Sequence, residues 1–505
     1  MQPPPHLRTL FTAFSAVNRK AFVTRQLRFN FVLSKVPAET SLFTDYLSGK
    51  AIPKTTLLET AACIVRYYMV NMALFLFFCL TKLLHIISGQ RCQIPGPDSV
   101  ILDSYCVVPR ILKSGVFADS YFGDIAHVLE QQRTPIVYLP RLYGSRNPLT
   151  YIKLFVLLKE SGANVLTEYQ LISPRQLLSL WWDLLSMPYH VLRLCGDLDP
   201  TSREQAFIRH ALIRGLRSGH LDPCSRYWAA MRLGSQLDAT AKPISWYENQ
   251  SVDKAFSRGL RDGGFSGRHY GAQLLVWPAT LLNTHRDTVD EVYDMTPDIV
   301  VVNGPYFLPD DDNDGQSVYR CGPSMRYKHI FERAATRNLQ GPATVLLSYF
   351  HDETLRTLQA IRPLFSKIGL RFKFHPATNP QRYREFLPEN ATIVTGSLIS
   401  AIEGSSVVIG SGTGTLAEAV ALGIPAITVE SPDRFCHNYL PPFGKGILWE
   451  VCSAPERIDT VRSTLLSATS PQQREDMRRQ FRDLLFRDPT EEAILEAFDL
   501  RPNAA

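Results

Sequence analysis

Residues 407–425 read VVIGSGTGTLAEAVALGIP, and this stretch decides the class of fold. A run of β-branched residues ends in a turn rich in Gly, Ser and Thr. A helical stretch follows, and Gly423 ends it before a new apolar run begins at Ile424. A strand, a tight turn and a helix in this order are typical of the parallel sheet of an α/β protein. The stretch therefore predicts a βα unit with its turn at the carboxyl end of the strand.

The turn itself, residues 410–415, is a candidate binding site. Glycines let the backbone approach a ligand closely, and the free N–H groups at the start of a helix attract phosphate. Glu418 lies one turn inside the predicted helix, within reach of ribose hydroxyls. The turn lacks the Lys of a P-loop and the spacing of a dinucleotide fingerprint. We expect it to bind the phosphate of a nucleotide; the alternative is a purely structural glycine-rich turn.

Outward from this unit, short β-branched or aromatic runs alternate with longer helical stretches. This alternation predicts parallel sheets in an α/β protein. The runs form two series, separated near residues 275–295, and so predict two domains. The first series comprises 99–108, 135–139, 164–168 and 244–247; the second comprises 298–302, 343–349, 370–374, 392–395, 407–409 and 426–429. The expected domains are 93–285 and 286–470, followed by a charged, amphipathic C-terminal helix at 471–505.

A second candidate site residue is His375, in the sequence FKFHP at 372–376. The His-Pro pair ends an amphipathic strand, and ligands of α/β sheets collect at the carboxyl ends of strands. A histidine at that place can donate a hydrogen bond to a phosphate. Taken alone, a histidine at a strand end also fits a structural role.

A third candidate is Glu248, which ends the aromatic strand of SWYENQSVDKAF, residues 245–256. A carboxylate at such a position is a candidate general base. Its alternative role is to cap the helix that begins near Val252. Downstream, RHYGAQ at 268–273 places a second polar strand end, so the sequence predicts a strand, a helix and a strand. Both tips would then line one cleft, through Asn249, Gln250 and Gln273.

Composition narrows the function classes. The chain has 505 residues, 45% hydrophobic and 20% charged, which excludes a disordered, collagen-like or small disulfide-stapled protein. The nine cysteines are scattered without zinc spacing, which favours reduced thiols. No Asp-x-Asp motif stands where a metal-dependent nucleotide-sugar transferase would need it, and no GxSxG elbow is present. We therefore expect no bound metal.

The net charge of +6 is concentrated at the N-terminus. Residues 1–54 hold eight basic and two acidic residues, so the remaining 451 residues sum to zero, which argues against a nucleic-acid partner. An uncharged apolar run follows at 67–81, bounded by Arg66 and Lys82, and apolar residues continue to Ile87. The run is short for a spanning helix. An interfacial membrane helix, a transmembrane span and a buried or partner-binding helix all remain open; the basic residues before it favour the membrane.

Together these motifs resemble a known enzyme family. The ordered set YENQSVDKAF…RHYGAQ, KFHPAT and GSGTGTLAEAVALGIPAI is similar to bacterial surface-polysaccharide glycosyltransferases of the GT-B type. It is most similar to the groups that use CMP-activated sugars, the sialyltransferase-like and Kdo-transferase-like enzymes. The stretch from VILDSYCVVPR to TPIVYLPRLYG also resembles the first strands of such transferases. The resemblance covers residues 98–455.

The resemblance implies an α/β, GT-B-like fold with two Rossmann-type domains facing a cleft. It implies a glycosyltransferase that needs no metal or other cofactor and takes a nucleotide sugar as co-substrate. Its acceptor would be a glycan or lipid-linked molecule at the cytoplasmic face of the plasma membrane. The implied roles are catalysis by Glu248 and His375, phosphate binding by Ser411, Gly412, Thr413 and Thr415, and ribose binding by Glu418. The rival interpretations are a non-hydrolysing sugar-nucleotide epimerase of the same fold and a non-catalytic scaffold for polysaccharide assembly.

Overall fold

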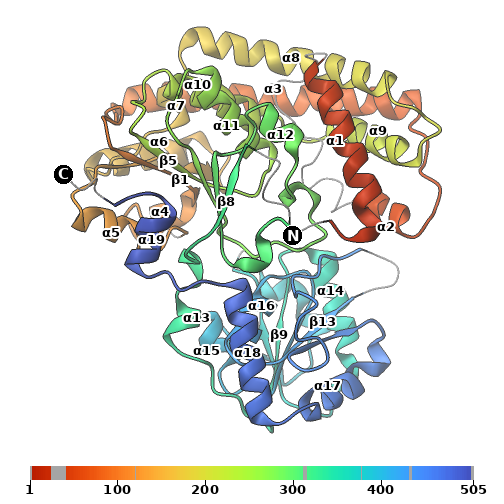
Figure 1. Ribbon diagram of the computed structural model, residues 1–505. Coiled ribbons are helices and arrows are strands. Elements are labelled where there is room, and N and C mark those ends of the chain that lie inside the picture. Colours follow the sequence, from red (N-terminus) through yellow and green to blue (C-terminus); the bar gives the residue numbers. More distant parts are fainter. Residues whose placement is uncertain are drawn as a thin grey trace.

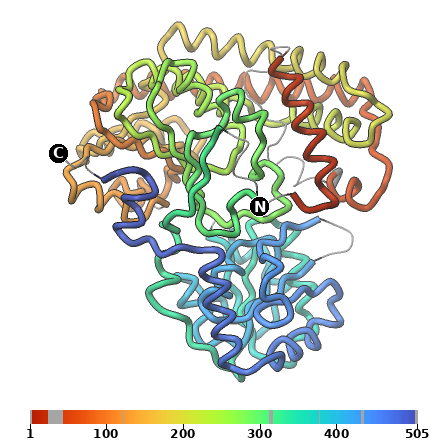
Figure 2. Tube along the Cα trace, in the orientation of Figure 1, coloured from red at the N-terminus to blue at the C-terminus, as the bar shows by residue number. Residues whose placement is uncertain are grey.

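The computed structural model describes residues 3–23, 41–119, 121–310, 316–376, 378–430 and 435–501. Two lobes lie one above the other in Figure 1, each built around a parallel sheet. Figure 2 shows that the chain completes most of the upper lobe before it enters the lower one, and that its final segment returns to the upper lobe. The lobes are therefore joined by two crossings of the chain.

The sheet of the first lobe has six strands, all parallel. Parallel strands need long crossover connections, and here these are helical. In spatial order the strands are β3 (Ile136–Tyr138), β1 (Val100–Asp103), β5 (Lys242–Trp246), β6 (Tyr270–Ala272), β7 (Ile299–Val302) and β8 (Val318–Cys321). Two further short strands, β2 (Tyr105–Val107) and β4 (Arg141–Tyr143), pair beside this sheet.

The sheet of the second lobe also has six parallel strands. In spatial order they are β11 (Thr392–Ile393), β10 (Leu370–Lys373), β9 (Ala343–Leu346), β12 (Val407–Gly410), β13 (Ala426–Val429) and β14 (Trp449–Cys452). The stretch that opened the sequence analysis forms β12, α16 and β13, and Gly423 turns the chain between them with φ +105°. Two parallel sheets covered by helices confirm the predicted α/β class with two Rossmann-like domains.

Helices cover both faces of each sheet, which is why the strands are apolar on both sides. In the first sheet, alternate residues of one strand point to opposite layers: Val100 and Leu102 pack with α5 and α19, whereas Ile101 joins the cluster of α10 and α11. In the second sheet, Val407 and Ile409 face α14 and α17, whereas Val408 faces α16 and α18. The strand period of two thus divides each lobe into layers.

The helices follow the same division. Those of the first lobe are α4 (Val108–Ser114), α5 (Ile125–Gln131), α6 (Pro148–Glu160), α7 (Glu168–Leu171), α8 (Pro174–Gly196), α9 (Arg203–Gly215), α10 (Leu221–Gly234), α11 (Ser251–Asp262) and α12 (Thr288–Val292). Those that follow are α13 (His329–Glu332), α14 (His351–Ala360), α15 (Leu398–Ile402), α16 (Thr415–Ala421), α17 (Ile458–Ser467), α18 (Pro471–Leu485) and α19 (Glu491–Ala497). The 3₁₀ turns are η1 (Pro5–Leu7), η2 (Leu282–Thr284), η3 (Pro305–Phe307), η4 (Met325–Tyr327), η5 (Arg362–Leu364), η6 (Pro380–Phe386) and η7 (Pro455–Arg457).

The basic N-terminal region is partly a packed helix and not a free arm. Helix α1 (Arg8–Val23) buries Leu10, Phe14 and Val17 against α9 and α12, and Ser15 Oγ donates to Asp287 Oδ2 over 2.7 Å. Helix α2 (Ser41–Leu47) reaches the second lobe, where Phe435 N–H donates to Thr44 Oγ1 over 2.9 Å. Residues 24–40, which carry three of the basic residues counted above, lie outside the described part of the chain.

The apolar run forms the middle of a single long helix, α3 (Leu57–Ser88), which is long and apolar enough to cross a membrane. One face of this helix packs on the first lobe from end to end, through Cys63, Tyr67, Phe78 and His85. Tyr67 and Tyr68 also donate to the backbone carbonyls of α8. The opposite face exposes Val65, Met69, Met72, Leu76, Leu80, Leu83, Ile86 and Ile87. One face of α3 thus lies along the first lobe, and the opposite face is apolar and exposed.

The boundary between the two sheets differs from the expected one. We predicted a boundary at residues 285/286, but β7 and β8 extend the first sheet, so it falls between Cys321 and Ala343. The tail, predicted as one helix at 471–505, instead forms two helices, α18 and α19, and the second returns to the first lobe. Its helix α18 ends against Gly304, where an added Cβ would lie 2.5 Å from the backbone of Leu485. Helix α19 then packs against α5 on the first sheet.

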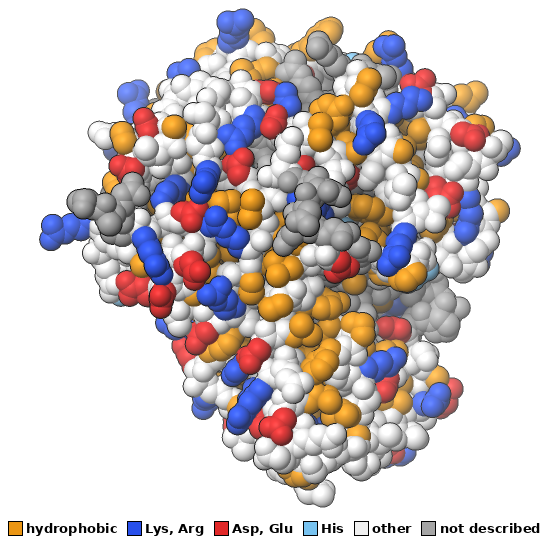
Figure 3. Space-filling view, viewed as in Figure 1, with side chains coloured by type: hydrophobic (Ala, Val, Ile, Leu, Met, Phe, Trp, Pro, Cys, Tyr) orange, Lys and Arg blue, Asp and Glu red, His pale blue; other side chains and the backbone are white. Residues whose placement is uncertain are grey.

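Two strand predictions fail for physical reasons. Residues 164–168 form only an isolated bridge from Val165 to Tyr138, because Thr167 caps helix α7 immediately afterwards. The predicted strand 99–108 divides into β1 and β2, and Pro109 starts helix α4. Strands β8 and β14 were not predicted. Acidic and basic side chains are interspersed over the face of the molecule shown in Figure 3, in keeping with the near-zero charge of the chain after residue 54.

Candidate functional site

The carboxyl ends of the two sheets meet around Tyr327. After β6 the chain runs to Val276, whose N–H donates to the hydroxyl of Tyr327 over 3.0 Å. In the second lobe, a Cβ added to Gly414 would lie 3.7 Å from Cβ of Val276. Tyr247 and Trp277 share one apolar cluster with Leu416 and Ala417 of α16, together with Val276 and Tyr327. The glycine turn of the second lobe thus lies directly against strand ends of the first.

Glu248 is held in a tightly bonded loop at the end of β5. The N–H groups of Glu248 and Gln250 both donate to Asp253 Oδ2, over 3.0 and 2.9 Å. Asn249 lies between them with φ +53°, and Asn283 donates to the Glu248 carbonyl over 2.6 Å. The N-cap of α11 is Gln250, so the structure does not bear out the alternative in which Glu248 caps this helix. The loop instead fixes the direction of the Glu248 side chain.

The Glu248 carboxylate accepts a hydrogen bond from the side-chain amide of Gln250 and is 6% exposed. Its electrostatic influence extends to the second lobe. Burial raises the pKa of Tyr327, and the carboxylates of Glu418 and Glu248 raise it further. Both carboxylates therefore act on the Tyr327 phenol through their charge. They belong to the predicted base and the predicted ribose-binding residue, which are 170 positions apart in the sequence.

The glycine turn after β12 is lined by an unexpected carboxylate. Gly412 has φ +58°, and an added Cβ would lie 2.3 Å from Oε2 of Glu353, at the start of α14. Ser348 Oγ donates to the same Glu353 oxygen over 2.6 Å, and the buried Ser411 contacts Cys436 Sγ at 3.2 Å. A carboxylate repels phosphate but accepts hydrogen bonds from hydroxyls. The neighbourhood of Gly412 therefore suits a sugar hydroxyl better than a phosphate.

The other residues of the turn face a half-exposed surface. Thr413 Oγ1 donates to Thr415 Oγ1 over 3.1 Å and accepts from the Thr415 N–H over 3.3 Å. Helix α16 starts at Thr415, as predicted. The Glu418 carboxylate, one turn inside, lies 3.2 Å from Nε2 of His329 on α13. The two threonine hydroxyls thus lie in the half-exposed part of the turn.

His375 lies at the carboxyl end of β10, as predicted, with its ring 5.3 Å from that of Tyr349. Partial burial lowers its pKa, and the guanidinium of Arg326 lowers it further. The imidazole is therefore uncharged near neutral pH and has one N–H to donate. Because Arg326 lies on η4, in the segment that joins the lobes, His375 is on the side of the second sheet that faces the first lobe.

The three polar residues expected to line the acceptor side behave differently from one another. Gln273 is buried, and its amide is used internally: Oε1 accepts from Asn303 N–H over 2.9 Å and Nε2 donates to the Leu275 carbonyl over 2.8 Å. It therefore ties β6 to β7 and does not line an open surface. Asn249 is also buried and donates to Asp290 over 3.3 Å, whereas Gln250 is half-buried beside Glu248.

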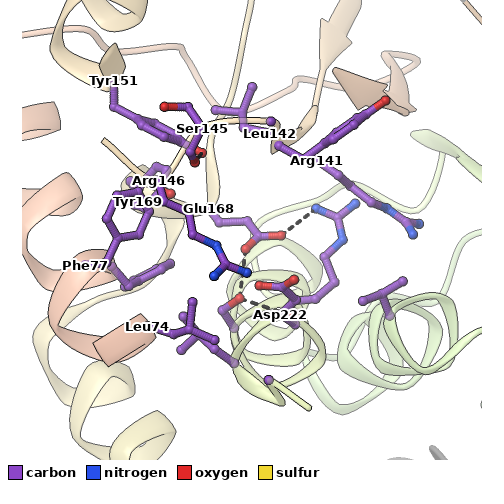
Figure 4. A pocket seen from close by; sticks show the side chains of 18 of the residues that line it. Leu74, Phe77, Arg141, Leu142, Ser145, Arg146, Tyr151, Glu168, Tyr169 and Asp222 are labelled. Atoms are coloured by element: carbon purple, nitrogen blue, oxygen red, sulfur yellow. Dashed lines mark hydrogen bonds and ion pairs between the residues drawn. The ribbon is translucent and has the colours of Figure 1, made fainter. Parts of the chain in front are cut away.

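A cavity in the first lobe was missed by the sequence analysis. It has a volume of about 620 Å³ and lies between α3, α6, α7 and α10, beside β4 (Figure 4). The charged residues around it come from separate segments and form no local motif: Arg141, Arg146, Glu168, Asp222 and Arg226. The one available signal was the Pro140-Arg141 pair immediately after the predicted strand 135–139. A polar residue at that place lies at the carboxyl edge of a parallel sheet.

Buried ion pairs form the floor of this cavity. Arg141 donates to both oxygens of Asp103, over 3.1 and 2.7 Å, and to Asp253 over 2.6 Å. Arg226 pairs with the same Asp103 and, over 3.1 Å, with Glu168. Asp253 also holds the Glu248 loop, so the cavity floor and the candidate base share one residue. Among the described residues, no group of three or more His, Cys, Asp or Glu side chains is arranged to hold a metal ion.

Comparison with known proteins gives a similar fold and no family. No family model matches the chain, and no curated protein matches it. Similar solved structures include the MurG of Acinetobacter baumannii, 13% identical over 80% of this chain and 98% of that one, with a TM-score of 0.40. They also include the UDP-GlcNAc 2-epimerase of Neisseria meningitidis, 10% identical over 80% and 100% of the two chains, with a TM-score of 0.43. The wall teichoic acid polymerase TagF is 9% identical over 88% and 97%, with a TM-score of 0.37. These values are low, so the functional argument rests on the site itself.

Proposed function

We propose that this protein is a glycosyltransferase that moves a sugar from a nucleotide-activated donor to an acceptor hydroxyl. The observation that carries the proposal is the convergence on Tyr327. Glu248, on the first lobe, and Glu418, on the second, both raise the pKa of Tyr327, whose hydroxyl accepts from the N–H of Val276 beside Gly414 of the glycine turn. A transferase of two substrates needs a base beside one binding surface and a leaving-group site beside the other.

In this proposal each residue acts at a stated place. Glu248 takes the proton of the acceptor hydroxyl, held in position by Gln250 and by the loop that Asp253 fixes. Glu418 binds a ribose hydroxyl. His375 and the hydroxyls of Thr413 and Thr415 hydrogen-bond the phosphate of the leaving nucleotide. Donors that are already in place when charge develops on the leaving group lower the barrier without reorganisation.

The contact between Glu353 and Gly412 refines the expected site. Because this carboxylate disfavours a phosphate next to Ser411 and Gly412, those two residues bind the donor through its hydroxyls. The phosphate is assigned to Thr413, Thr415 and His375. The sequence resemblance favours a CMP-linked donor. The nucleotide screen described next identifies the nucleobase.

Nucleotide binding is the first test. One of CMP, UDP, GDP and TDP is expected to raise the melting temperature, because a ligand at a hundred times its Kd stabilises the folded state by about 2.7 kcal/mol. The substitution Gly412→Ala is expected to abolish this shift, since its Cβ would collide with Glu353. The matched control is Gly404→Ala, which has the same left-handed backbone with nothing within 4 Å of an added Cβ. A shift that survives Gly412→Ala would contradict the assigned site.

Two measurements distinguish the rival functions: an assay without acceptor and the thermal-shift screen. A non-hydrolysing epimerase would interconvert a nucleotide sugar without any acceptor, which NMR of the sugar would detect, whereas a transferase would not. A non-catalytic scaffold would give no thermal shift with any of the four nucleotides. Glu248 favours the transferase, because Asp253 and Arg141 tie its loop to the wall of a cavity large enough for a second substrate.

The proposal includes a membrane-bound location at the cytoplasmic face. Its support is the surface formed by α3 and α8, which pack side by side, with the rings of Phe75 and Trp181 at 4.7 Å. Helix α3 exposes the apolar residues named above, and α8 adds Leu178, Trp182 and Tyr189. A long apolar face of this kind, with an aromatic residue beside it, fits a helix lying in the membrane interface.

Membrane binding is expected to depend on this face. Met69→Glu combined with Leu76→Glu places two charges on residues that are 69% and 60% exposed, and is expected to move the protein from the membrane pellet to the supernatant. Deleting residues 1–90 would remove α1 and part of the core, so it is a poor test. The control is Val292→Glu with Leu339→Glu, which are 61% and 57% exposed and lie elsewhere. The assignment would be refuted if both double variants left the membrane pellet, or if neither did.

A further inference from the structure

The cavity between α3 and the first lobe has the form of a ligand site. Its volume of about 620 Å³ is within the range of about 300–1,000 Å³ that small ligands occupy. It also lies next to the candidate base. Arg141, on its wall, donates to Asp253, and Asp253 accepts from the Glu248 N–H. Tyr105, another wall residue, accepts from Arg141 over 3.2 Å.

The charges around the cavity nearly cancel. The guanidinium groups of Arg141 and Arg226 are paired with carboxylates behind the wall, and Glu168 is paired with Arg226. Figure 4 shows Arg146 and Asp222 pointing into the space between these pairs. Three guanidiniums and two carboxylates line the cavity, and Asp103 and Asp253, which pair with Arg141 behind the lining, bring the set to four carboxylates against three guanidiniums. Such a set has no excess positive charge to hold a phosphate, which normally requires one.

The same groups are well suited to hydroxyls. A carboxylate accepts from a hydroxyl and a guanidinium donates to one, so Glu168, Asp222 and Arg146 offer both halves of the hydrogen bonds that a sugar makes. The surrounding protein and the neighbouring Glu168 together raise the pKa of Asp222 to about 6, against the opposing charge of Arg146, and the side chain is exposed to the cavity space. Part of the Asp222 population is therefore protonated below neutral pH, and a protonated carboxyl can also donate.

Aromatic rings supply the apolar part of the wall. Tyr151 and Tyr169 come from α6 and α7, and Phe77 and Phe78 come from α3. In Figure 4, Leu74 and Phe77 line the side of the cavity formed by α3, opposite Arg141. Pockets that combine aromatic faces with a few directed polar groups bind ligands that have both kinds of surface. The ring of a sugar has apolar C–H faces and a rim of hydroxyls.

We propose that this cavity binds an uncharged saccharide, the sugar end of the acceptor, with its hydroxyls on Glu168, Asp222 and Arg146 and its ring against the aromatic wall. The assignment as acceptor rests on the proposed transferase function; the binding of an uncharged saccharide does not. Because α3 forms one wall, a lipid attached to the sugar would leave the cavity along that helix.

The test measures binding of octyl glycosides of glucose, galactose, N-acetylglucosamine and N-acetylgalactosamine to the full chain, with octyl phosphate as the charged probe. Calorimetry below the micelle concentration would give the Kd values. At least one glycoside is expected to bind at least ten-fold more tightly than octyl phosphate. Asp222→Asn and Arg146→Gln should each weaken that binding at least ten-fold, and the exposed Asp488→Asn should leave it unchanged.

Three results would overturn the proposal. Tighter binding of octyl phosphate than of every glycoside would make the cavity an anion site. Equal binding by wild type and both cavity variants would place the saccharide elsewhere. Failure of all four glycosides to bind would remove the saccharide class. The nucleotide thermal shift is measured separately: saccharide binding without any nucleotide shift would refute the transferase and leave the cavity assignment intact.

Discussion

Replacement of Glu248 by glutamine is expected to lower kcat for sugar transfer by about 10²- to 10⁴-fold, the usual contribution of a general base. Glutamine keeps the size and the polar end of the side chain but cannot take a proton from the acceptor. The loop around residue 248 is held by backbone hydrogen bonds to Asp253 and Asn283, which the substitution leaves in place. The measurement is the initial rate of transfer from sugars linked to the nucleotide that the thermal-shift screen identifies.

The control for this substitution is Glu389→Gln, on an exposed loop of the second lobe. It should leave the rate unchanged. The Glu248 variant should keep its circular dichroism spectrum and its nucleotide-induced thermal shift, because the nucleotide is assigned to the other lobe. A variant that retains full activity would exclude Glu248 as the base. A variant that also loses the nucleotide shift would indicate a structural role.

Replacement of Arg141 by alanine is expected to give the largest loss of stability, about 3–5 kcal/mol. Arg141 is 8% exposed and pairs with Asp103 and Asp253. Its removal leaves two buried carboxylates facing one another, with Arg226 as the remaining partner of Asp103. Taking one partner from a buried ion pair costs more than the pair contributed, because the other charge stays desolvated.

The measurement is the midpoint of urea denaturation followed by tryptophan fluorescence, since Trp246 lies on β5, next to this network. The matched control is Arg479→Ala, which breaks a surface ion pair with Glu475 and is expected to cost at most about 1 kcal/mol. A loss for Arg141→Ala as small as that of the control would mean that the network contributes little to the folded state.

The fold could be predicted wherever a strand and the turn that follows it have a recognisable sequence pattern. The stretch 407–425 forms a βα unit because its strand, glycine turn and helix are adjacent in the sequence. Strands β8 and β14 were missed because both are short edge strands with a mixed pattern; Val318 is exposed and Arg320 carries a charge. The domain boundary was wrong because strand 298–302 has the same apolar pattern in either sheet, and only long-range pairing assigns it to the first.

The positions of the candidate residues were predictable to the same extent. Glu248, His375 and the glycine turn lie at the ends of strands, as their local sequence pattern predicts, and their roles stay predictions. Gln273 ends a strand as well, but its amide is consumed by backbone groups that no sequence pattern reveals. Glu353 and the cavity were missed because their partners are distant in sequence: Glu353 meets Gly412 and Asp222 faces Glu168 only after folding.

Helix α3 has one consequence for kinetics. One side of the helix is the proposed membrane surface and another side is a wall of the cavity, so an acceptor anchored in the bilayer could enter the cavity by moving sideways in two dimensions. The rate would then follow the mole fraction of acceptor in the lipid and not its bulk concentration. With a water-soluble acceptor, added lipid would change the rate very little. With a lipid-anchored acceptor, inert lipid mixed into the same vesicles would slow the reaction in proportion to the fall in the acceptor's mole fraction. The rate of the proposed transferase would thus depend on the surface dilution of its acceptor.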